Sequence, residues 1–202
     1  MLQELQDCLD TLELQLGAPS ASVGAPPSPS PSVSAETGAE TETGAVRCVV
    51  ITSSLGKVFS AGADLKERAS MTQDQAAEFV TLLRNTMERV ACLPVPVLAA
   101  VEGVAVGRGG LELALAADLR IVSSTATFGL PETTLAIVPG TGGTQRLGRL
   151  IGVARAKELI WTGRRIQGDE ALQYGLVEMV VRITGTTSLG GSNELRFVFQ
   201  KK

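Results

Sequence analysis

The chain has 202 residues, a formal net charge of −3 and 44% hydrophobic residues, which is enough for one domain with a sizeable core. Its mildly acidic charge and its aromatic content of 3% argue against general binding to nucleic acid or to an anionic membrane. The sequence contains no histidine, which excludes Ser-His-Asp and Cys-His catalysis and most zinc sites. We therefore expect no metal site.

The three cysteines, Cys8, Cys48 and Cys92, stand far apart in the sequence. They have neither the spacing of metal ligands nor the even number of a disulfide framework, which fits a reducing compartment. No apolar run is long enough to cross a membrane. The start of the chain is acidic rather than rich in arginine, so we predict no targeting segment in it.

The first 45 residues divide into a leucine-rich part and a low-complexity part. Leucines recur at steps of three and four from Leu2 to Leu16, which predicts an amphipathic helix. Such a helix either binds a partner or packs on its own domain, and we favour the second interpretation. Residues 17–45 are rich in Pro, Ser and Gly and cannot bury enough apolar area to fold, so we predict a disordered insertion.

The next segments alternate between strand and helix signals. The apolar run Val46–Thr52 predicts a buried strand, and a glycine-broken segment follows it. Thr72 with Gln75 three residues later is the signature of a capping box, and the apolar positions after it predict a helix that ends before Pro94. Alternation of this kind predicts an α/β architecture with right-handed crossovers.

Residues 97–124 combine a strand, a glycine turn, a short helix and a second strand. Val97–Val101 is the first strand, and Leu111–Ala117 is predicted as a helix that is apolar on every side except at Glu112. A carboxylate in a buried helix is costly unless it is paired or used. Glu112 is therefore either neutralised by the helix dipole or by Arg108, or it has a chemical function.

The following segment contains a second acidic candidate and a glycine-rich helix start. Pro131 predicts a loop, and Glu132 directly after it would ordinarily be a surface residue. The glycines between Gly140 and Gly143 precede a basic helix, whose start either holds a phosphate or makes a tight turn. The pattern then predicts two helices, a strand and a polar tail, over residues 153–162, 169–174, 176–181 and 182–202.

Three segments, in this order, resemble the crotonase (enoyl-CoA hydratase/isomerase) superfamily: FSAGADLKER, GVAVGRGGLELALAADLR and FGLPETTLAIVPGTGGTQRL. The resemblance covers about residues 46–181 and the leucine helix. The sequences of these segments are most similar to those of the branch that contains methylglutaconyl-CoA hydratases and enoyl-CoA hydratase domain-containing proteins. The resemblance implies an α/β fold, a spiral of strand–strand–helix repeats, which we expect here to be incomplete and shortened at both ends.

The resemblance also implies an acyl-CoA thioester substrate, with coenzyme A as part of the substrate and no other cofactor. In the family, two backbone N–H groups bind the thioester oxygen as it becomes an enolate, and these correspond to Ala63 and Gly109. Donors aimed at developing charge in this way are worth about 3–4 kcal/mol each. The implied substrate contacts are Ser60, Ala61, Ala63, Asp64, Leu65 and Lys66.

Hydratases of this family use two glutamates, which correspond to Glu112 and Glu132, 20 positions apart as in the family. The resemblance implies that Glu112 deprotonates the water that attacks the β-carbon and that Glu132 delivers a proton to the α-carbon. These two roles, base and acid, require one carboxyl to be ionised while the other is protonated. The implied activity is hydration of a 2-enoyl-CoA in the breakdown of fatty acids or branched-chain amino acids.

The sequence departs from the family pattern in the glycine turn. The pattern G-x-A-x-G-G-G-x-E is one residue shorter than GVAVGRGGLE, and Arg108 is the additional residue. We expect it to rotate the Gly109 amide, and a misplacement of about 1 Å can cost about 100-fold in rate. The alternatives are therefore a catalytically impaired, truncated fragment, or isomerisation, which commonly needs one carboxylate.

The resemblance has further implications for partners and compartment. The family forms homotrimers and hexamers, although the C-terminal helices that build them are missing from the pattern here. The resemblance implies a mitochondrial location, with the cytoplasm as the alternative. One member of the branch binds RNA through a lysine-rich first helix, but residues 2–16 contain no lysine, so we expect no nucleic-acid partner.

Overall fold

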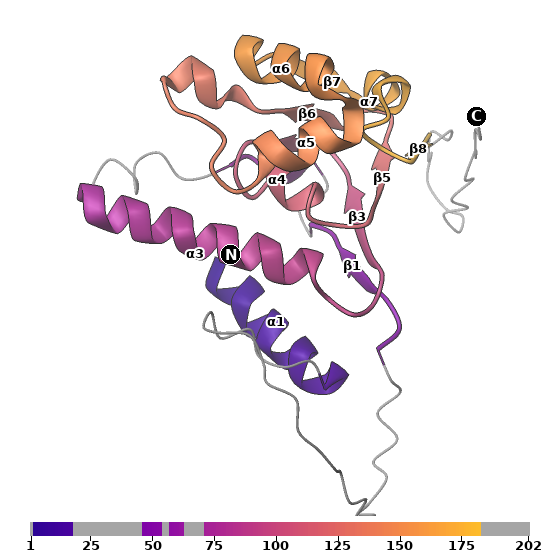
Figure 1. The fold of residues 1–202 in the computed structure, drawn as a ribbon. Coiled ribbons are helices and arrows are strands. Elements are labelled where there is room, and N and C mark those ends of the chain that lie inside the picture. Colours follow the sequence, from indigo (N-terminus) through magenta and orange to yellow (C-terminus); the bar gives the residue numbers. More distant parts are fainter. Residues whose placement is uncertain (1, 18–45, 54–56, 63–70, 183–202) are drawn as a thin grey trace, which may run out of the picture.

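The structure is a computed structural model that describes residues 2–17, 46–53, 57–62 and 71–182 (Figure 1). The predicted insertion after Gly17 and the predicted tail after Arg182 lie outside the described residues, so the predicted domain boundaries stay predictions. Within the described ranges, no helix is both long enough and apolar enough to cross a bilayer.

The described strands form two four-stranded sheets, to which successive parts of the chain contribute alternately. The first sheet is parallel throughout and has the order β1 (Val49–Ile51), β3 (Val97–Val101), β5 (Leu119–Ser123) and β8 (Met179–Val181). The second has the order β2 (Val58–Ser60), β4 (Val104–Val106), β6 (Thr127–Gly129) and β7 (Arg165–Gln167), with only the last pair antiparallel. The predicted α/β fold of strand–strand–helix repeats is confirmed.

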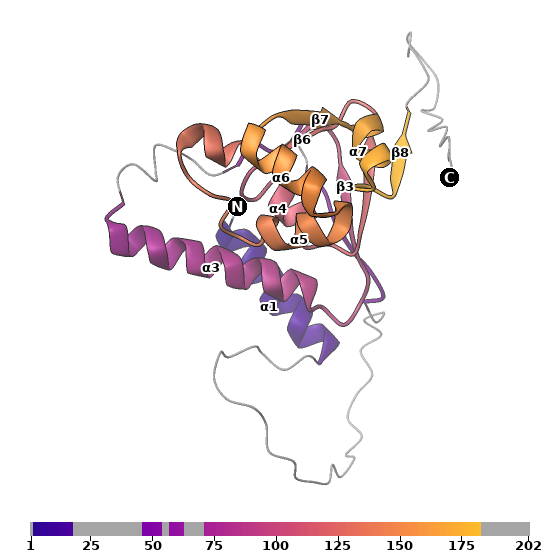
Figure 2. The same ribbon diagram turned by 45° about the horizontal axis from the view of Figure 1, so that its top comes forward.

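The helices lie in two groups on either side of the short α4 (Figures 1 and 2). The long α3 lies against α1, whereas α5 and α6 pack against each other and α6 packs against the 3-10 helix η1. Their bounds are α1 Leu2–Leu16, α3 Gln73–Ala91, α4 Leu111–Ala114, η1 Pro131–Leu135, α5 Gly143–Ile151, α6 Val153–Thr162 and α7 Gly168–Tyr174. This arrangement places α4, and with it Glu112, in the interior.

The predicted capping box begins α3. The Gln75 amide donates to the Thr72 hydroxyl at 3.3 Å, and the Thr72 amide donates to the Gln75 side chain at 2.9 Å. A cap of this kind stabilises a helix by about 1 kcal/mol. The helix ends at Ala91, before Pro94, as predicted.

The leucine helix α1 packs on its own domain. The Leu9 side chain is only 2% exposed and belongs to the main hydrophobic core. Arg89 of α3 forms ion pairs with Asp10 at 2.5 Å and with Glu13 at 2.9 Å. The interpretation of this helix as part of the domain is therefore confirmed.

The helix predicted over Leu111–Ala117 is wrong in length, because α4 ends at Ala114. The reason is the buried Arg120 guanidinium, which donates to the carbonyl oxygens of Ala114 and Ala117. These carbonyls therefore bond to a side chain instead of continuing the helical ladder. Arg120 is held in place by an ion pair with Glu178 at 2.6 Å.

The strands β2, β4, β6 and β7 were not predicted, because none of them lies in an apolar run of four or more residues that would indicate a strand. The loop predicted around Pro131 is wrong in part, because β6 precedes this proline and η1 begins at it. Proline is well suited to the first position of a helix, where no partner is available for an N–H group.

The packing of α1 gives a prediction for stability. We expect Leu9→Ala to lower the free energy of unfolding by about 2–4 kcal/mol, as is typical of a buried leucine. Leu14→Ala is the matched control on the same helix, because Leu14 is 84% exposed, and we expect a change below about 0.5 kcal/mol. Urea denaturation measures both, and equal effects would contradict the packing described here.

Candidate active site

Glu112 lies in the first turn of α4 and is 0% exposed. The backbone amides of Thr141 and Gly143 donate to its Oε1 atom at 3.0 Å and 2.7 Å. The Thr141 hydroxyl donates to its Oε2 atom. A buried carboxylate without partners would be strongly unfavourable, so these three hydrogen bonds are what permits Glu112 to lie in the core.

The donors to Glu112 come from the glycine-rich start of α5. Gly142 precedes this helix with a φ of +108°, and Gly143 is its first residue. The sequence indicated a phosphate site or a tight turn here, and in the structure the chain's own Glu112 carboxylate occupies the helix start, where negative charge is favoured. Thr141 and Gly143 are partners of Glu112 that the sequence analysis missed, and the glycine cluster was the available signal.

Glu132 lies in η1, directly after Pro131, and is only 5% exposed. Burial raises the pKa of the Glu132 carboxyl above its ordinary value, and the negative charge of Glu112 raises it further. A hydrogen bond from its own amide, the charge of Arg108 and a hydrogen bond from the Arg108 amide oppose this rise in pKa. The surface interpretation of Glu132 taken alone is therefore wrong.

One oxygen of Glu132 has a distinctive environment. Within the described residues, the buried Oε2 atom has no hydrogen-bond partner. The other oxygen, Oε1, lies close to the glycine turn, because a Cβ added to Gly107 would stand 3.0 Å from it. Because Glu132 lines a pocket, a group or water molecule in that pocket is what can satisfy this oxygen.

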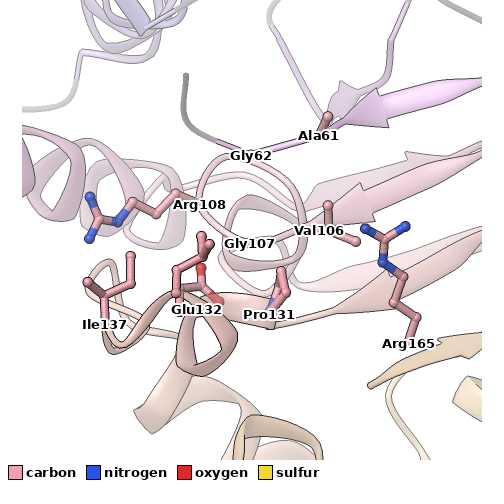
Figure 3. A pocket seen from close by; sticks show the side chains of 10 residues that line it. Ala61, Gly62, Val106, Gly107, Arg108, Pro131, Glu132, Ile137 and Arg165 are labelled. Atoms are coloured by element: carbon pink, nitrogen blue, oxygen red, sulfur yellow. The ribbon is translucent and has the colours of Figure 1, made fainter. Parts of the chain in front are cut away.

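A pocket of about 170 Å³ opens beside Glu132 (Figure 3). In Figure 3 the Arg108 side chain extends toward Ile137, and the Arg165 side chain lies on the other side of Pro131. The lining residues are Ala61, Gly62, Val106, Gly107, Arg108, Pro131, Glu132, Leu135, Ile137 and Arg165. Within the described ranges, no group of His, Cys, Asp and Glu side chains is arranged to hold a metal ion.

The end of β2 contacts the glycine turn directly. The Ser60 hydroxyl accepts a hydrogen bond from the Gly62 amide at 3.3 Å, and Ala61 lines the pocket. A Cβ added to Gly110 would lie 2.8 Å from the Ser60 carbonyl oxygen, so only glycine fits this approach. The other predicted substrate contacts, Ala63, Asp64, Leu65 and Lys66, lie outside the described residues.

The glycine turn itself has two glycines with positive φ, Gly107 at +59° and Gly109 at +72°. The Gly107 carbonyl oxygen accepts from the amides of Gly110 and Glu112, at 3.2 Å and 3.3 Å. The Gly109 amide donates to no acceptor within the described part of the chain. The residues of this turn that line the pocket are Gly107 and Arg108, so the assignment of Gly109 as a thioester donor stays a prediction.

Two sheets built from strand–strand–helix repeats, with two buried glutamates beside a glycine-rich turn, define a crotonase fold. The family model described as enoyl-CoA hydratase/isomerase matches residues 37–184, and the chain belongs to this family. The fold and the family that the sequence motifs implied are thus confirmed.

Individual relatives agree with this assignment. The chain is 57% identical over 135 residues to the putative enoyl-CoA hydratase/isomerase YngF of Bacillus subtilis, covering 67% of this chain and 52% of YngF. It is 52% identical over 136 residues to the mitochondrial methylglutaconyl-CoA hydratase of Mus musculus, covering 67% of this chain and 43% of that protein. The chain therefore spans about half the length of these relatives.

A solved structure is also similar over most of the chain. The crystal structure of the enoyl-CoA hydratase from Bacillus anthracis has a TM-score of 0.72 and 49% sequence identity. The match covers 90% of this chain and 59% of that chain. At the level of the family, the relatives are enzymes named for enoyl-CoA hydration or isomerisation.

The contact between Gly143 and Glu112 gives a prediction. A Cβ added to Gly143 would lie 2.7 Å from Glu112 Oε1, so we expect Gly143→Ala to displace the carboxylate and to destabilise the fold by about 1–3 kcal/mol. Gly148→Ala on the same helix is the control, because its Cβ would meet only Ala156 Cβ at 4.0 Å. We expect this control to stabilise by about 0.5–1 kcal/mol in urea denaturation, and equal losses in both variants would count against the contact.

The raised pKa of Glu132 gives a prediction for the pH dependence of stability. Its carboxyl ionises at a higher pH in the folded chain than its ordinary value of 4.5, so its contribution is fully present below that pH and is lost as the pH rises through the folded pKa. We expect the free energy of unfolding of Glu132→Gln to rise relative to the parent chain over this range. Urea denaturation at a series of pH values measures this, with the exposed Glu102→Gln as control. Parallel curves for the parent and Glu132→Gln would contradict it.

Proposed function

We propose that the chain adds water to the double bond of a 2-enoyl-CoA thioester. The observation that carries this proposal is the pair of buried glutamates, which interact electrostatically and have different environments. Glu112 accepts three hydrogen bonds, whereas Glu132 has a raised pKa and an unsatisfied oxygen. Two carboxyl groups that differ in this way are suited to act as a base and an acid in one reaction.

The proposed reaction adds one molecule of water across the double bond of the enoyl thioester. Glu112 takes a proton from water, whose oxygen forms a bond to the β-carbon of the substrate, and the electron pair of the double bond moves toward the thioester oxygen. Glu132 then donates its proton to the α-carbon, so one molecule of water is added and nothing is oxidised or reduced. A general acid or base of this kind typically contributes about 10²–10⁴-fold in rate.

The amides of Ala63 and Gly109 are the proposed donors to the thioester oxygen. The positive φ of Gly109 and the absence of an acceptor for its amide within the described residues support its part in this proposal. The pocket-lining position of Ala61 supports a role for the segment from Ser60 to Lys66 in holding the substrate. Coenzyme A would enter as part of the substrate, and we propose no further cofactor.

A second candidate function is enoyl-CoA isomerisation, in which a single carboxylate moves a proton between two carbons. One observation favours it: Glu132 lines the pocket and Glu112 does not. In that reaction Glu132 would act first as a base and then as an acid, and Glu112 would only stabilise the fold.

The names of the relatives support two further proposals. The mouse methylglutaconyl-CoA hydratase is a mitochondrial protein, and YngF is bacterial. A mitochondrial location, with a role in the breakdown of fatty acids or branched-chain amino acids, is accordingly part of the proposal. Assembly into the homotrimers or hexamers of the family, and the absence of a nucleic-acid partner, are also proposals for this chain.

Substitution of each glutamate separates the two candidate functions. We expect both Glu112→Gln and Glu132→Gln to lower the rate of crotonyl-CoA hydration by at least about 100-fold, whereas the exposed Glu102→Gln leaves it unchanged. If isomerisation of a 3-enoyl-CoA is the activity, Glu132→Gln abolishes it and Glu112→Gln does not. Loss of enoyl thioester absorbance and product chromatography measure the two reactions. Turnover that survives both substitutions would rule out the proposed mechanism.

A further inference from the structure

A second cleft lies between α3 and α5, apart from the candidate active site. These two helices lie side by side in both views of the fold (Figures 1 and 2). The cleft has a volume of about 510 Å³, within the range of about 300–1,000 Å³ that is typical of small-molecule sites. Its lining residues, none of which lines the pocket beside Glu132, are Arg84, Glu88, Ala91, Pro139, Gly140, Gly142, Thr144, Gln145, Arg146 and Arg149.

The charges that line this cleft are unbalanced. Three arginines, Arg84, Arg146 and Arg149, stand against a single acidic residue, Glu88. The chain as a whole has a net charge of −3, so this excess of two positive charges is a local feature. A cleft lined by charges of one sign concentrates the electric field and attracts ions of the opposite sign. The lining of this cleft therefore favours a ligand that is an anion.

Two of the three arginines are held in place by backbone carbonyl groups. Arg84 Nε and Nη2 donate to the Gly140 carbonyl oxygen at 3.2 Å and 3.0 Å. Arg146 Nη1 donates to the Thr141 carbonyl oxygen at 3.1 Å, and Arg146 Nη2 forms an ion pair with Glu88 at 2.7 Å. An arginine that served only to keep the surface hydrated would extend into water instead. Because these side chains are already fixed, a ligand that binds them loses less entropy.

The contacts of the arginines leave donors available for a ligand. Arg84 Nη1 donates to no acceptor, and Arg149 makes no hydrogen bond or ion pair, within the residues that the structure describes. The Thr144 amide at the start of α5 has no acceptor in the described ranges either, whereas the Gly143 amide donates to Glu112. Guanidinium groups and the amides of a helix start are the donors that proteins use to bind phosphate.

We propose that the cleft between α3 and α5 binds the phosphate group of a small molecule, with Arg84, Arg149 and the Thr144 amide as donors. A phosphate monoester carries a charge of about −1.5 to −2 at pH 7, which matches the excess of two positive charges, whereas a carboxylate would neutralise only half of it. Ala91 and Pro139 are the apolar side chains of the lining, so the cleft recognises the phosphate rather than a hydrocarbon chain. The site is separate from the glutamates and does not depend on the proposed hydration.

The test is a titration of the isotope-labelled full chain with inorganic phosphate, followed by nuclear magnetic resonance of the backbone amides. We expect saturable shifts at Gly142 and Thr144, and none with chloride at the same ionic strength. Arg84→Met and Arg149→Met should each weaken the binding by at least about tenfold, as is typical of a lost hydrogen bond to a charged group. Arg155→Met is the matched control, because it removes an exposed cation of α6 that lies outside the cleft.

A variant of the acidic residue tests the role of charge with the opposite sign. Glu88→Gln increases the positive excess of the cleft, so we expect phosphate to bind about two- to fivefold more tightly, the size typical of a charge pair at a surface. A cleft that acts through its shape alone would lose affinity when the partner of Arg146 is removed. Weaker binding in Glu88→Gln would therefore contradict the proposal.

Competition identifies the molecule that carries the phosphate. If coenzyme A displaces inorganic phosphate and dephospho-coenzyme A does not, the 3′-phosphate of the thioester substrate is the ligand. Displacement by both assigns the cleft to the diphosphate of coenzyme A, and displacement by neither assigns it to a separate phosphate monoester. The absence of saturable shifts in the cleft, or equal weakening in Arg84→Met, Arg149→Met and Arg155→Met, would overturn the proposal.

Discussion

The structure depends above all on the three hydrogen bonds that hold the Glu112 carboxylate in the core. They join the first turn of α4 to Thr141 and Gly143 at the start of α5, 29 and 31 positions away. A buried carboxylate without donors is strongly unfavourable, so the burial of Glu112 requires the start of α5 to lie against α4 at this point. At the other end of α4, the Arg120 guanidinium bonds to the Ala114 carbonyl oxygen. The element that carries Glu112 is thus fixed by polar contacts at both ends.

The two glutamates differ in how well their oxygen atoms are satisfied, and this difference is the basis of the functional proposal. Glu112 accepts hydrogen bonds at both oxygens, whereas Glu132 has a buried oxygen without a partner among the described residues. Burial and the charge of Glu112 both raise the pKa of Glu132. The carboxyl with the raised pKa, Glu132, is therefore the one that lines the pocket, and perturbed pKa values of this kind are common at functional sites.

Much of the fold could be predicted because its longer elements have clear local signals. The strand Val97–Val101 and the helix Val153–Thr162 have the predicted bounds, since apolar character and a following glycine define them locally. The strands β2, β4, β6 and β7 lack such a signal, because no apolar run of four or more residues marks them, and α4 is short because Arg120 bonds to its end. The partners of Glu112 could not be read from the sequence, because they lie far along the chain. The electrostatic interaction between the two glutamates could be expected from the family resemblance alone.

The central claim is that both glutamates and the glycine turn surround one thioester group. A crystal structure of the protein with butyryl-CoA, which can be neither hydrated nor isomerised, tests it most directly. The account predicts the thioester oxygen at hydrogen-bond distance from the Gly109 amide, with the α-carbon next to Glu132 and the β-carbon on the side of Glu112. A thioester bound away from the pocket beside Glu132, or a Gly109 amide directed away from the thioester oxygen, would contradict it.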